Sequence, residues 1–441
     1  MTDAAGRDLD LVLWGATGFT GRLVAHHLAR HGKNVRWALG GRSAEKLEAL
    51  REELAAVRSE ARDLPLVVGD SLDVRSLEPI VRRARVVCTT VGPYSLYGTP
   101  LLSLCAELGT DYCDLAGEVA WMRRNVDRFH ERARRSGARI VHCCGFDSIP
   151  SDLGILLAHR RLAEDGARLV RARLRVRRLD GRMSGGTVAT LFETVAQARR
   201  DPGARRLLLD PYALDPSLER RGPDRNGGSG PRRDRDRGMW TAPFLMAIIN
   251  TRVVRRSNAL LGYPYGEDFR YDERVDTGRG LRGRLRARLL ATGLAAFTGA
   301  AAFGPTAWLL RRFFLPDPGE GPSAAERESG GFRIEILGDG LPEAAAEAGP
   351  DAAPRAGRKP LRARVTVSSE LDPGYGATAP MLGESALCLA RGEAEGLESG
   401  VLTPASALGL PLVERLRPVG ITFEASLEDP QLPTARRPAV R

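Results

Sequence analysis

The chain is nearly devoid of lysine: only Lys33, Lys46 and Lys359 occur among its 66 basic residues, and the remainder are arginines. None of the three follows a tyrosine by four positions, so the Tyr-x-x-x-Lys catalytic pair of short-chain dehydrogenases is absent. The arginine bias is better explained by codon composition than by nucleic-acid binding. The arginines are not interleaved with aromatic residues and no recognition motif occurs, so we expect no nucleic-acid partner.

Cysteine and metal motifs are also scarce. The six cysteines lie mostly in apolar runs without Cys-x-x-Cys spacing, which predicts buried, reduced thiols and no zinc site. No Gly-x-Ser-x-Gly nucleophile elbow and no Gly-Lys-Ser/Thr phosphate loop occurs. The start of the chain is polar and does not read as a signal peptide, so we expect a cytoplasmic protein.

Long uncharged runs are absent with one exception, residues 289–310. The chain has 441 residues, 43% hydrophobic and 27% charged, which excludes wholesale disorder and a polytopic membrane protein. Its net charge of +11 is concentrated in residues 151–312, and arginines flank the uncharged run on both sides. Three interpretations compete for 279–312: a transmembrane helix, a peripheral contact with an anionic membrane, or a helix pair that is buried in the protein or forms an apolar substrate tunnel. The Ala and Gly residues of the run and the break at Gly304-Pro305 argue against the transmembrane helix, and we favour the third interpretation.

Strand-like and helix-like segments alternate through the first 150 residues. The expected strands are 10–14, 35–39, 64–68, 85–90, 111–115 and 139–144, and the expected helices are 20–31, 43–58, 99–108 and 119–136. Such alternation implies right-handed crossovers and a Rossmann-type, doubly wound parallel sheet. We therefore assign residues 1–150 to a dinucleotide-binding domain.

The pattern changes after Pro150. Residues 168–178 alternate apolar side chains with arginine, as a strand with one solvent-exposed face would, and 332–337 and 361–369 are further strands. They predict a second α/β domain with an open sheet over 151–376. Residues 201–238 read as an exposed insertion and 339–360 as a low-complexity loop. Helices at 377–391 and 406–415 belong to a C-terminal part, 377–441.

The clearest chemical motif is the glycine-rich turn after the first strand. It has GxxGxxG spacing and opens a helix, so glycines without Cβ atoms let a pyrophosphate approach the free N–H groups of the helix N-terminus. A glycine-rich structural turn is the alternative. The residues assigned to the cofactor here are Gly15, Thr17, Gly18, Phe19, Thr20 and Gly21.

The end of the second strand indicates which dinucleotide binds. NAD-binding folds carry an acid there, whereas this chain has Arg42 and Ser43, with Lys46 one turn later. Arginine pairs with a 2′-phosphate and an acid would repel it, so we predict NADP(H); Arg42 could instead only cap the strand. Asp70 is placed near the adenine, or is a plain turn residue. Thr90 and Gly92 are placed on the nicotinamide side.

Several segments together resemble the saccharopine dehydrogenase-like oxidoreductases, and most closely the trans-acting enoyl reductase branch. They are GATGFTG (15–21), GGRS (40–43), 91–118, GFDSIPSD (145–152), SGGT (184–187), PGEGPS (318–323) and GVLTPASALG (400–409). The resemblance spans about residues 11–421. It implies C-terminal helices that return to the first domain and hydride transfer to a C=C or C=N bond.

Polar residues at strand ends are the candidates for catalysis. We predict Tyr94 as the proton donor and Asp147 with Ser148 as substrate-orienting residues. Alternatively, Asp147 caps the next helix and Tyr94 packs under the cofactor. The expected activity is NADPH-dependent reduction of an enoyl bond in a hydrophobic lipid or polyketide substrate, small or carried on an acyl carrier. A saccharopine-type C=N reductase and a non-catalytic, lipid-associated NADP-binding protein are the alternatives.

Overall fold

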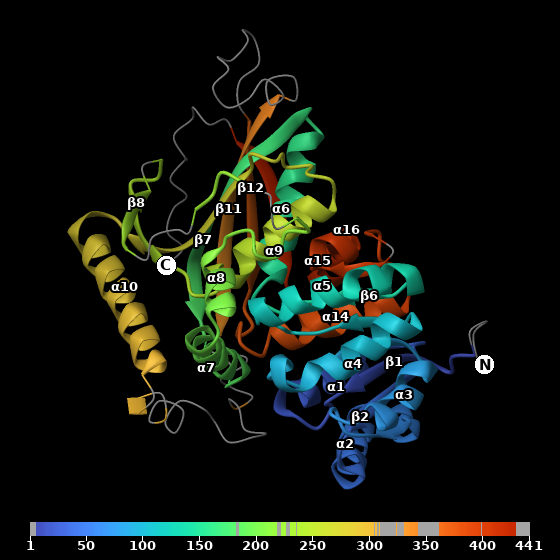
Figure 1. Ribbon diagram of the computed structural model, residues 1–441. Helices are drawn as coiled ribbons and strands as arrows, with labels where there is room; N and C mark the ends of the chain where they lie inside the picture. Colours follow the sequence, from blue (N-terminus) through green and yellow to red (C-terminus); the bar gives the residue numbers. More distant parts are fainter. Residues whose placement is uncertain are drawn as a thin grey trace.

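The computed structural model describes most of the chain. The described residues are 6–181, 185–217, 222–225, 230–234, 236–303, 305–306, 308, 323, 330–342, 361–397 and 399–428. Most of the expected loop 339–360 and the end of the run 289–310 lie outside them. Figure 1 shows two α/β units, one built on the N-terminal strands and one on the middle of the chain, with the last segments shared between them.

The first sheet is entirely parallel, as predicted for a Rossmann-type fold. Its strand order is β13-β6-β5-β4-β1-β2-β3. The strands are β1 (Leu9–Trp14), β2 (Trp37–Gly41), β3 (Leu66–Val68), β4 (Ala84–Thr89), β5 (Asp111–Cys113), β6 (Arg139–Val141) and β13 (Gly400–Leu402). The seventh strand, β13, comes from the C-terminal part and was not predicted. Three residues carry too little periodicity to be recognised as a strand.

Five helices of this unit connect the strands β1 to β6. They are α1 (Phe19–His31), α2 (Ala44–Val57), α3 (Val74–Arg83), α4 (Tyr94–Leu108) and α5 (Val119–Ser136). Gly109 and Gly137 end α4 and α5 in the left-handed conformation. Helix α4 begins five residues earlier than predicted. Its first turn is stabilised by the Glu118 carboxylate, which accepts the N–H groups of Tyr94 at 2.7 Å and Ser95 at 3.0 Å.

The second sheet is mixed, with the order β14-β12-β11-β7-β10-β9-β8. Its strands are β7 (Ala167–Asp180), β8 (Arg232–Asp234), β9 (Met239–Pro243), β10 (Arg270–Gly278), β11 (Gly331–Pro342), β12 (Leu361–Ser369) and β14 (Thr422–Glu428). Only β7 and β10 run parallel; the other neighbours are antiparallel. Helix α6 (Ile149–Ala163) packs on β7, β11 and β12, and a Cβ at Gly154 would lie 2.4 Å from Ile336.

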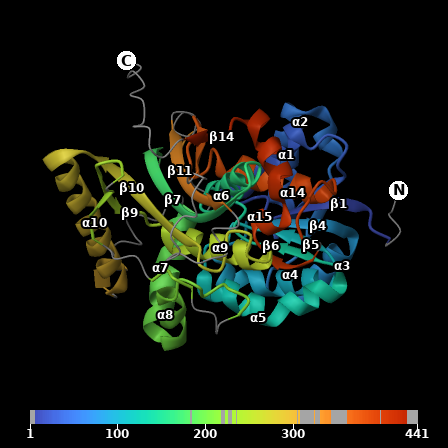
Figure 2. The ribbon, with the colours of Figure 1, turned by 90° about the horizontal axis from the view of Figure 1, so that it is seen from above.

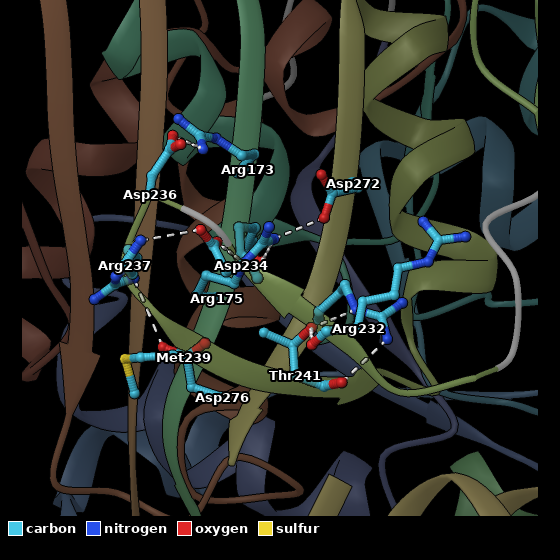
Figure 3. A network of polar contacts seen from close by, with 12 residues as sticks. Arg173, Arg175, Arg232, Asp234, Asp236, Arg237, Met239, Thr241, Asp272 and Asp276 are labelled. Carbon is cyan, nitrogen blue, oxygen red and sulfur yellow. Dashed lines mark hydrogen bonds and ion pairs between the residues drawn. The ribbon is translucent and has the colours of Figure 1, made fainter. Parts of the chain in front are cut away.

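The arginine face of β7 is not solvent-exposed throughout, as the sequence had suggested. Arg173 and Arg175 are buried, and Arg175 pairs with Asp272 at 2.7 Å and Asp234 at 3.2 Å. Figure 3 shows the segment that carries Asp234 and Asp236 lying over these arginines. Buried guanidinium groups are tolerated because acids from distant positions pair with them.

The expected exposed insertion, 201–238, is wrong for much of its described part. It contains helix α8 (Pro202–Leu209) and strand β8, and Ala213 and Leu214 are fully buried. Buried arginines bind the carbonyl groups of the turn that follows α8: Arg123 donates to Asp215 O and Arg256 to Leu214 O, both at 2.7 Å. These long-range bonds hold a segment that composition alone marks as loop.

The C-terminal part lies against the first unit. Helices α14 (Thr378–Ala390), α15 (Pro404–Ala407) and α16 (Gly409–Leu416) follow, and α14 packs on α1 and on the first sheet (Figure 2). Gly383 lets α14 approach α1 closely, because a Cβ at this position would lie only 2.5 Å from the His27 ring. Buried Glu384 also contacts His27 at 2.7 Å and Arg415 at 2.5 Å. Strand β14 then returns to the second sheet.

Helix α10 (Gly280–Ala302) carries most of the uncharged run and lies at the periphery in both views. It packs on β9, β10 and α7 (Gly185–Arg200) through one side only. Leu289 and Leu290 are 64% and 51% exposed, so the favoured expectation of a buried helix pair is wrong for this part of the run. Among the described residues, no helix is both long and apolar enough to cross a membrane.

Candidate functional site

The glycine turn lies between β1 and α1 and has the geometry of a phosphate cradle. Gly15 has φ +84°, and a Cβ there would lie 2.6 Å from Val91 Cγ2. A Cβ at Gly21 would lie 2.1 Å from the Gly15 carbonyl oxygen. These two glycines are therefore required by the protein's own packing.

Gly18 differs from its two neighbours in the motif. Its φ of −71° suits any residue, and a Cβ there would meet only the Gly15 carbonyl oxygen, at an ordinary 3.4 Å. Gly18 is the N-cap of α1, and no side chain caps the helix. The first turn, with Phe19 and Thr20, lines a cavity and presents the N-terminus of α1 to it, which suits a pyrophosphate.

The predicted 2′-phosphate residues lie together at the end of β2. Ser43 caps α2, and its Oγ accepts the Lys46 N–H at 3.3 Å, which leaves its hydroxyl proton able to donate to a phosphate. Arg42 and Lys46 are exposed, and the structure gives Arg42 no ion pair with any residue it describes. Thr17 Oγ1 lies 3.8 Å from the position of a Cβ on Gly41, so this side chain borders the same corner.

Asp70 is less specific. It is exposed after β3, and its Oδ1 accepts the Leu72 N–H at 2.8 Å in a tight turn. This bond is sufficient to explain an aspartate at this position of the turn. Its contact with an adenine stays a prediction.

The nicotinamide side is built by the loop after β4. Thr90 donates its hydroxyl to the Gly15 carbonyl at 3.1 Å and so ties this loop to the glycine turn. Gly92 and Tyr94 line the adjoining cavity. The Tyr94 hydroxyl donates to Thr89 O and accepts the Leu115 N–H, both at 3.1 Å, while its ring stacks on Trp121.

This environment affects the acidity of Tyr94. Burial, and then the nearby Asp114 carboxylate, raises the pKa of the phenol well above its usual value. A phenol that already uses its proton inside the protein is a poor proton donor. The geometry thus favours the alternative in which Tyr94 packs beneath the cofactor and shapes its pocket.

Asp147 and Ser148, which follow β6, have different surroundings. Asp147 lines the cavity, and loss of solvation raises the pKa of its carboxyl group to about 6. Asp147 is not the N-cap of α6, since that position is Ser148, and no side chain caps this helix. Ser148 is fully buried and donates to Asn250 Oδ1 at 3.1 Å. This bond engages its hydroxyl inside the protein, and its substrate-orienting role stays a prediction.

The cavity joins the two units and has a volume of about 970 Å³. One wall holds the glycine turn, the loop after β4 and Asp147. The opposite wall comes from α7, α8, α10 and the start of α9 (Ala247–Leu260). Its side chains are mainly apolar: Ala189, Leu191, Val195, Ala198, Leu208, Leu209, Leu245, Met246, Ile248, Ile249 and Ala302.

Sequence reasoning missed the residue that closes this cavity, Tyr375. Its ring meets Phe19 edge to face at 4.8 Å, and its hydroxyl accepts the Gly185 N–H at 2.8 Å. It thereby links the cofactor turn to the start of α7. The only sequence clue was the turn Asp-Pro-Gly-Tyr-Gly after β12, whose Asp372 carboxylate accepts the Tyr375 N–H at 2.8 Å.

Metal and thiol chemistry find no support in the described structure. All six cysteines are buried and unpaired, as predicted. Within the described residues, no cluster of three or more His, Cys, Asp or Glu side chains is arranged to bind a metal.

A parallel sheet with a glycine cradle that opens into a cavity shared with a second sheet defines a dinucleotide-dependent oxidoreductase. The family model for the saccharopine dehydrogenase NADP-binding domain matches residues 11–141, which confirms NADP(H) as the cofactor. A trans-acting enoyl reductase of Mycobacterium ulcerans is 41% identical over 448 residues, covering 96% of this chain and 99% of the relative. One of Mycobacterium tuberculosis is 40% identical over 434 residues, covering 95% and 98%.

The chain belongs to the trans-acting enoyl reductase family, with an NADP-binding domain of the saccharopine dehydrogenase type. Saccharopine dehydrogenase (L-Glu forming) from Saccharomyces cerevisiae shares the fold, with a TM-score of 0.50 over 95% of this chain and 99% of that one, at 12% identity. The resemblance inferred from the sequence motifs is thereby confirmed, and the protein is an NADP-dependent oxidoreductase.

Proposed function

We propose that the protein reduces the C=C bond of a hydrophobic enoyl thioester with NADPH. The observation that carries this proposal is the cavity itself, which the glycine turn and the loop after β4 share with a wall of apolar side chains. A long acyl chain gains about 0.8 kcal/mol for each methylene buried on such a wall. The family relationship supports the same reaction.

The residues of the cradle fit NADP(H). The N-terminus of α1 would hold the pyrophosphate, and Arg42, Ser43 and Lys46 would hold the 2′-phosphate. When bound, NADPH supplies a hydride to one carbon of the double bond. The chain's own task is to keep the acyl group against the nicotinamide side, exclude water and provide a proton to the other carbon.

Asp147 is the side chain best suited to provide that proton. It lines the cavity, and burial raises the pKa of its carboxyl group to about 6, so part of it stays protonated near neutral pH. Tyr94, in contrast, already donates its proton to Thr89 O. We therefore assign proton donation to Asp147 and pocket shaping to Tyr94.

The apolar wall argues against the saccharopine-type alternative, because an amino-acid substrate needs several charged partners deep in its site. NADPH oxidation with a long-chain 2-enoyl thioester, followed by mass spectrometry of the product, tests the main proposal. We expect a gain of two mass units in the acyl group. NADPH binding without turnover of thioesters or imines would instead support the non-catalytic alternative.

The cofactor preference yields a separate prediction. Arg42→Ala is expected to weaken NADPH binding about tenfold, equivalent to ~1.4 kcal/mol, and to leave NADH binding unchanged. Isothermal titration with both nucleotides measures this. Arg30→Ala is the matched control. Arg30 is exposed near the end of α1, about 16 Å along the helix axis from its first residue, Phe19, and so away from the predicted phosphate site. Equal losses for NADPH and NADH would contradict the role of Arg42.

We further propose that α10 makes a peripheral contact with an anionic membrane. Leu281, Leu285 and Leu289 recur every four residues along one helix face and are 82%, 59% and 64% exposed. Five arginines flank this stripe: Arg279, Arg282, Arg284, Arg286 and Arg288. An apolar stripe beside cationic side chains suits the surface of an anionic bilayer.

A flotation assay with vesicles tests this contact. The protein is expected to float with vesicles that contain phosphatidylserine and to stay behind with neutral vesicles. Replacing Leu285 and Leu289 by Asp should abolish flotation, whereas Leu72→Asp, at an exposed leucine of the first unit, should not. Flotation that is unchanged in the double variant would refute the role of α10.

A further inference from the structure

Four arginines gather where α7 meets α8, at one end of the cavity. Arg199 and Arg200 end α7, while Arg205 and Arg206 lie in α8. Only Arg199 and Arg205 line the cavity, and they are the only charged residues besides Asp147 among its lining residues. Both are exposed, so they stand at its opening rather than in its depth.

These two arginines have no structural role that the described residues reveal. The nearby acid, Asp201, is occupied as the N-cap of α8, where its Oδ1 accepts the Gly203 N–H at 2.7 Å. The structure gives Arg199 and Arg205 no ion pair with a residue it describes. Arg252 and Arg255 behave differently: Arg252 donates to Leu208 O at 2.6 Å, and Arg255 pairs with Asp224 at 2.6 Å.

The surroundings of the pair are amphipathic. Ala198 directly precedes Arg199, Leu208 and Leu209 follow Arg205 by three and four positions in α8, and all three line the same cavity. A ligand that fits both must therefore have an apolar part inside and an anionic part at the opening. An enoyl thioester has no free carboxylate, so the anion must sit on the thiol side of the molecule.

We propose that Arg199 and Arg205 form an anion site that binds the phosphate ester of a phosphopantetheine-type arm and so anchors the thioester substrate. Two guanidinium groups can each make paired hydrogen bonds to phosphate oxygens. This inference rests on the proposed enoyl reduction. It adds a recognition site outside the reacting centre, which acts on substrate binding and not on the chemical step.

The test compares two substrates that differ only in the phosphate: the 2-dodecenoyl thioesters of pantetheine and of 4′-phosphopantetheine. For the unaltered protein, KM for the phosphorylated thioester is expected to be at least about tenfold lower, with equal kcat. Replacing Arg199 and Arg205 by Gln should remove this difference by raising KM for the phosphorylated substrate only. Replacing Arg200 and Arg206 by Gln, at the adjacent positions that do not line the cavity, should preserve it.

The outcomes separate this site from the proposed function. Reduction of both thioesters with equal KM by the unaltered protein would overturn the anion site and leave enoyl reduction intact. Reduction of neither would overturn the proposed function. If the Arg200 and Arg206 variant also lost the KM difference, the assignment of the anion site to Arg199 and Arg205 would be refuted. A coenzyme A thioester and a carrier-protein thioester, run side by side, then distinguish a free from a protein-bound source of the phosphate.

Discussion

A Gly18→Asp protein is expected to lose NADPH binding while keeping, or slightly raising, its melting temperature. Aspartate is a preferred N-cap residue, and the φ of −71° at this position accepts it without strain. Its carboxylate would occupy the place of the pyrophosphate at the N-terminus of α1 and repel the cofactor's phosphates. We expect the Kd for NADPH to rise at least about a hundredfold, or roughly 2.7 kcal/mol.

Two further variants make this result specific, with isothermal titration and thermal unfolding measured on each. Gly21→Ala should lower both binding and melting temperature, since its Cβ would lie 2.1 Å from the Gly15 carbonyl oxygen. Gly293→Ala, on the exposed side of α10 with nothing within 4 Å, should leave NADPH binding unchanged and should not lower the melting temperature, because alanine favours the helix. If Gly18→Asp bound NADPH normally, the assignment of the cradle would have to be abandoned.

Asp147→Asn is expected to have the second large effect. Asparagine keeps the shape of the side chain but cannot give up a proton, so kcat should fall at least about a hundredfold. Binding of NADPH should be unchanged, because the phosphate cradle is not altered. Ser148→Ala provides the comparison at the next residue: it removes a buried hydrogen bond and costs about 1 kcal/mol of stability, but kcat should be retained.

The pH dependence of the unaltered protein follows from the same carboxyl group. Its pKa in the folded protein is raised from 3.8 to about 6 by loss of solvation. The protonated, active form therefore predominates below about pH 6, and kcat should fall as the pH rises through that value. The raised pKa also makes stability depend on pH. Its contribution to folding is fully present below the ordinary value of 3.8 and is lost as the pH rises through about 6. Asp147→Asn should remove only this group's share of the pH dependence of stability, because the pKa of buried Asp152 is also raised to about 6. A kcat that increases with pH would rule out Asp147 as the acid.

The local sequence was sufficient to predict the helices and strands that are stabilised by residues close in the chain. The first strand, the glycine turn, α2 and α5 lie where the sequence placed them, within a few residues. Predictions failed where a distant partner decides the structure. The start of α4 depends on Glu118, and the turn after α8 depends on Arg123 and Arg256.

By itself, the sequence indicated the class of protein and its cofactor, because the glycine turn between a strand and a helix, and Arg42 with Ser43 at the end of the next strand, are local patterns with a known physical use. Only the tertiary structure decided which side chains share the cavity. It brought Tyr375 to Phe19, placed Arg199 and Arg205 at the opening, left Asp147 without a partner among the described residues and engaged the Tyr94 hydroxyl. Those outcomes depend on desolvation and on contacts between residues far apart in the chain, which no local pattern encodes.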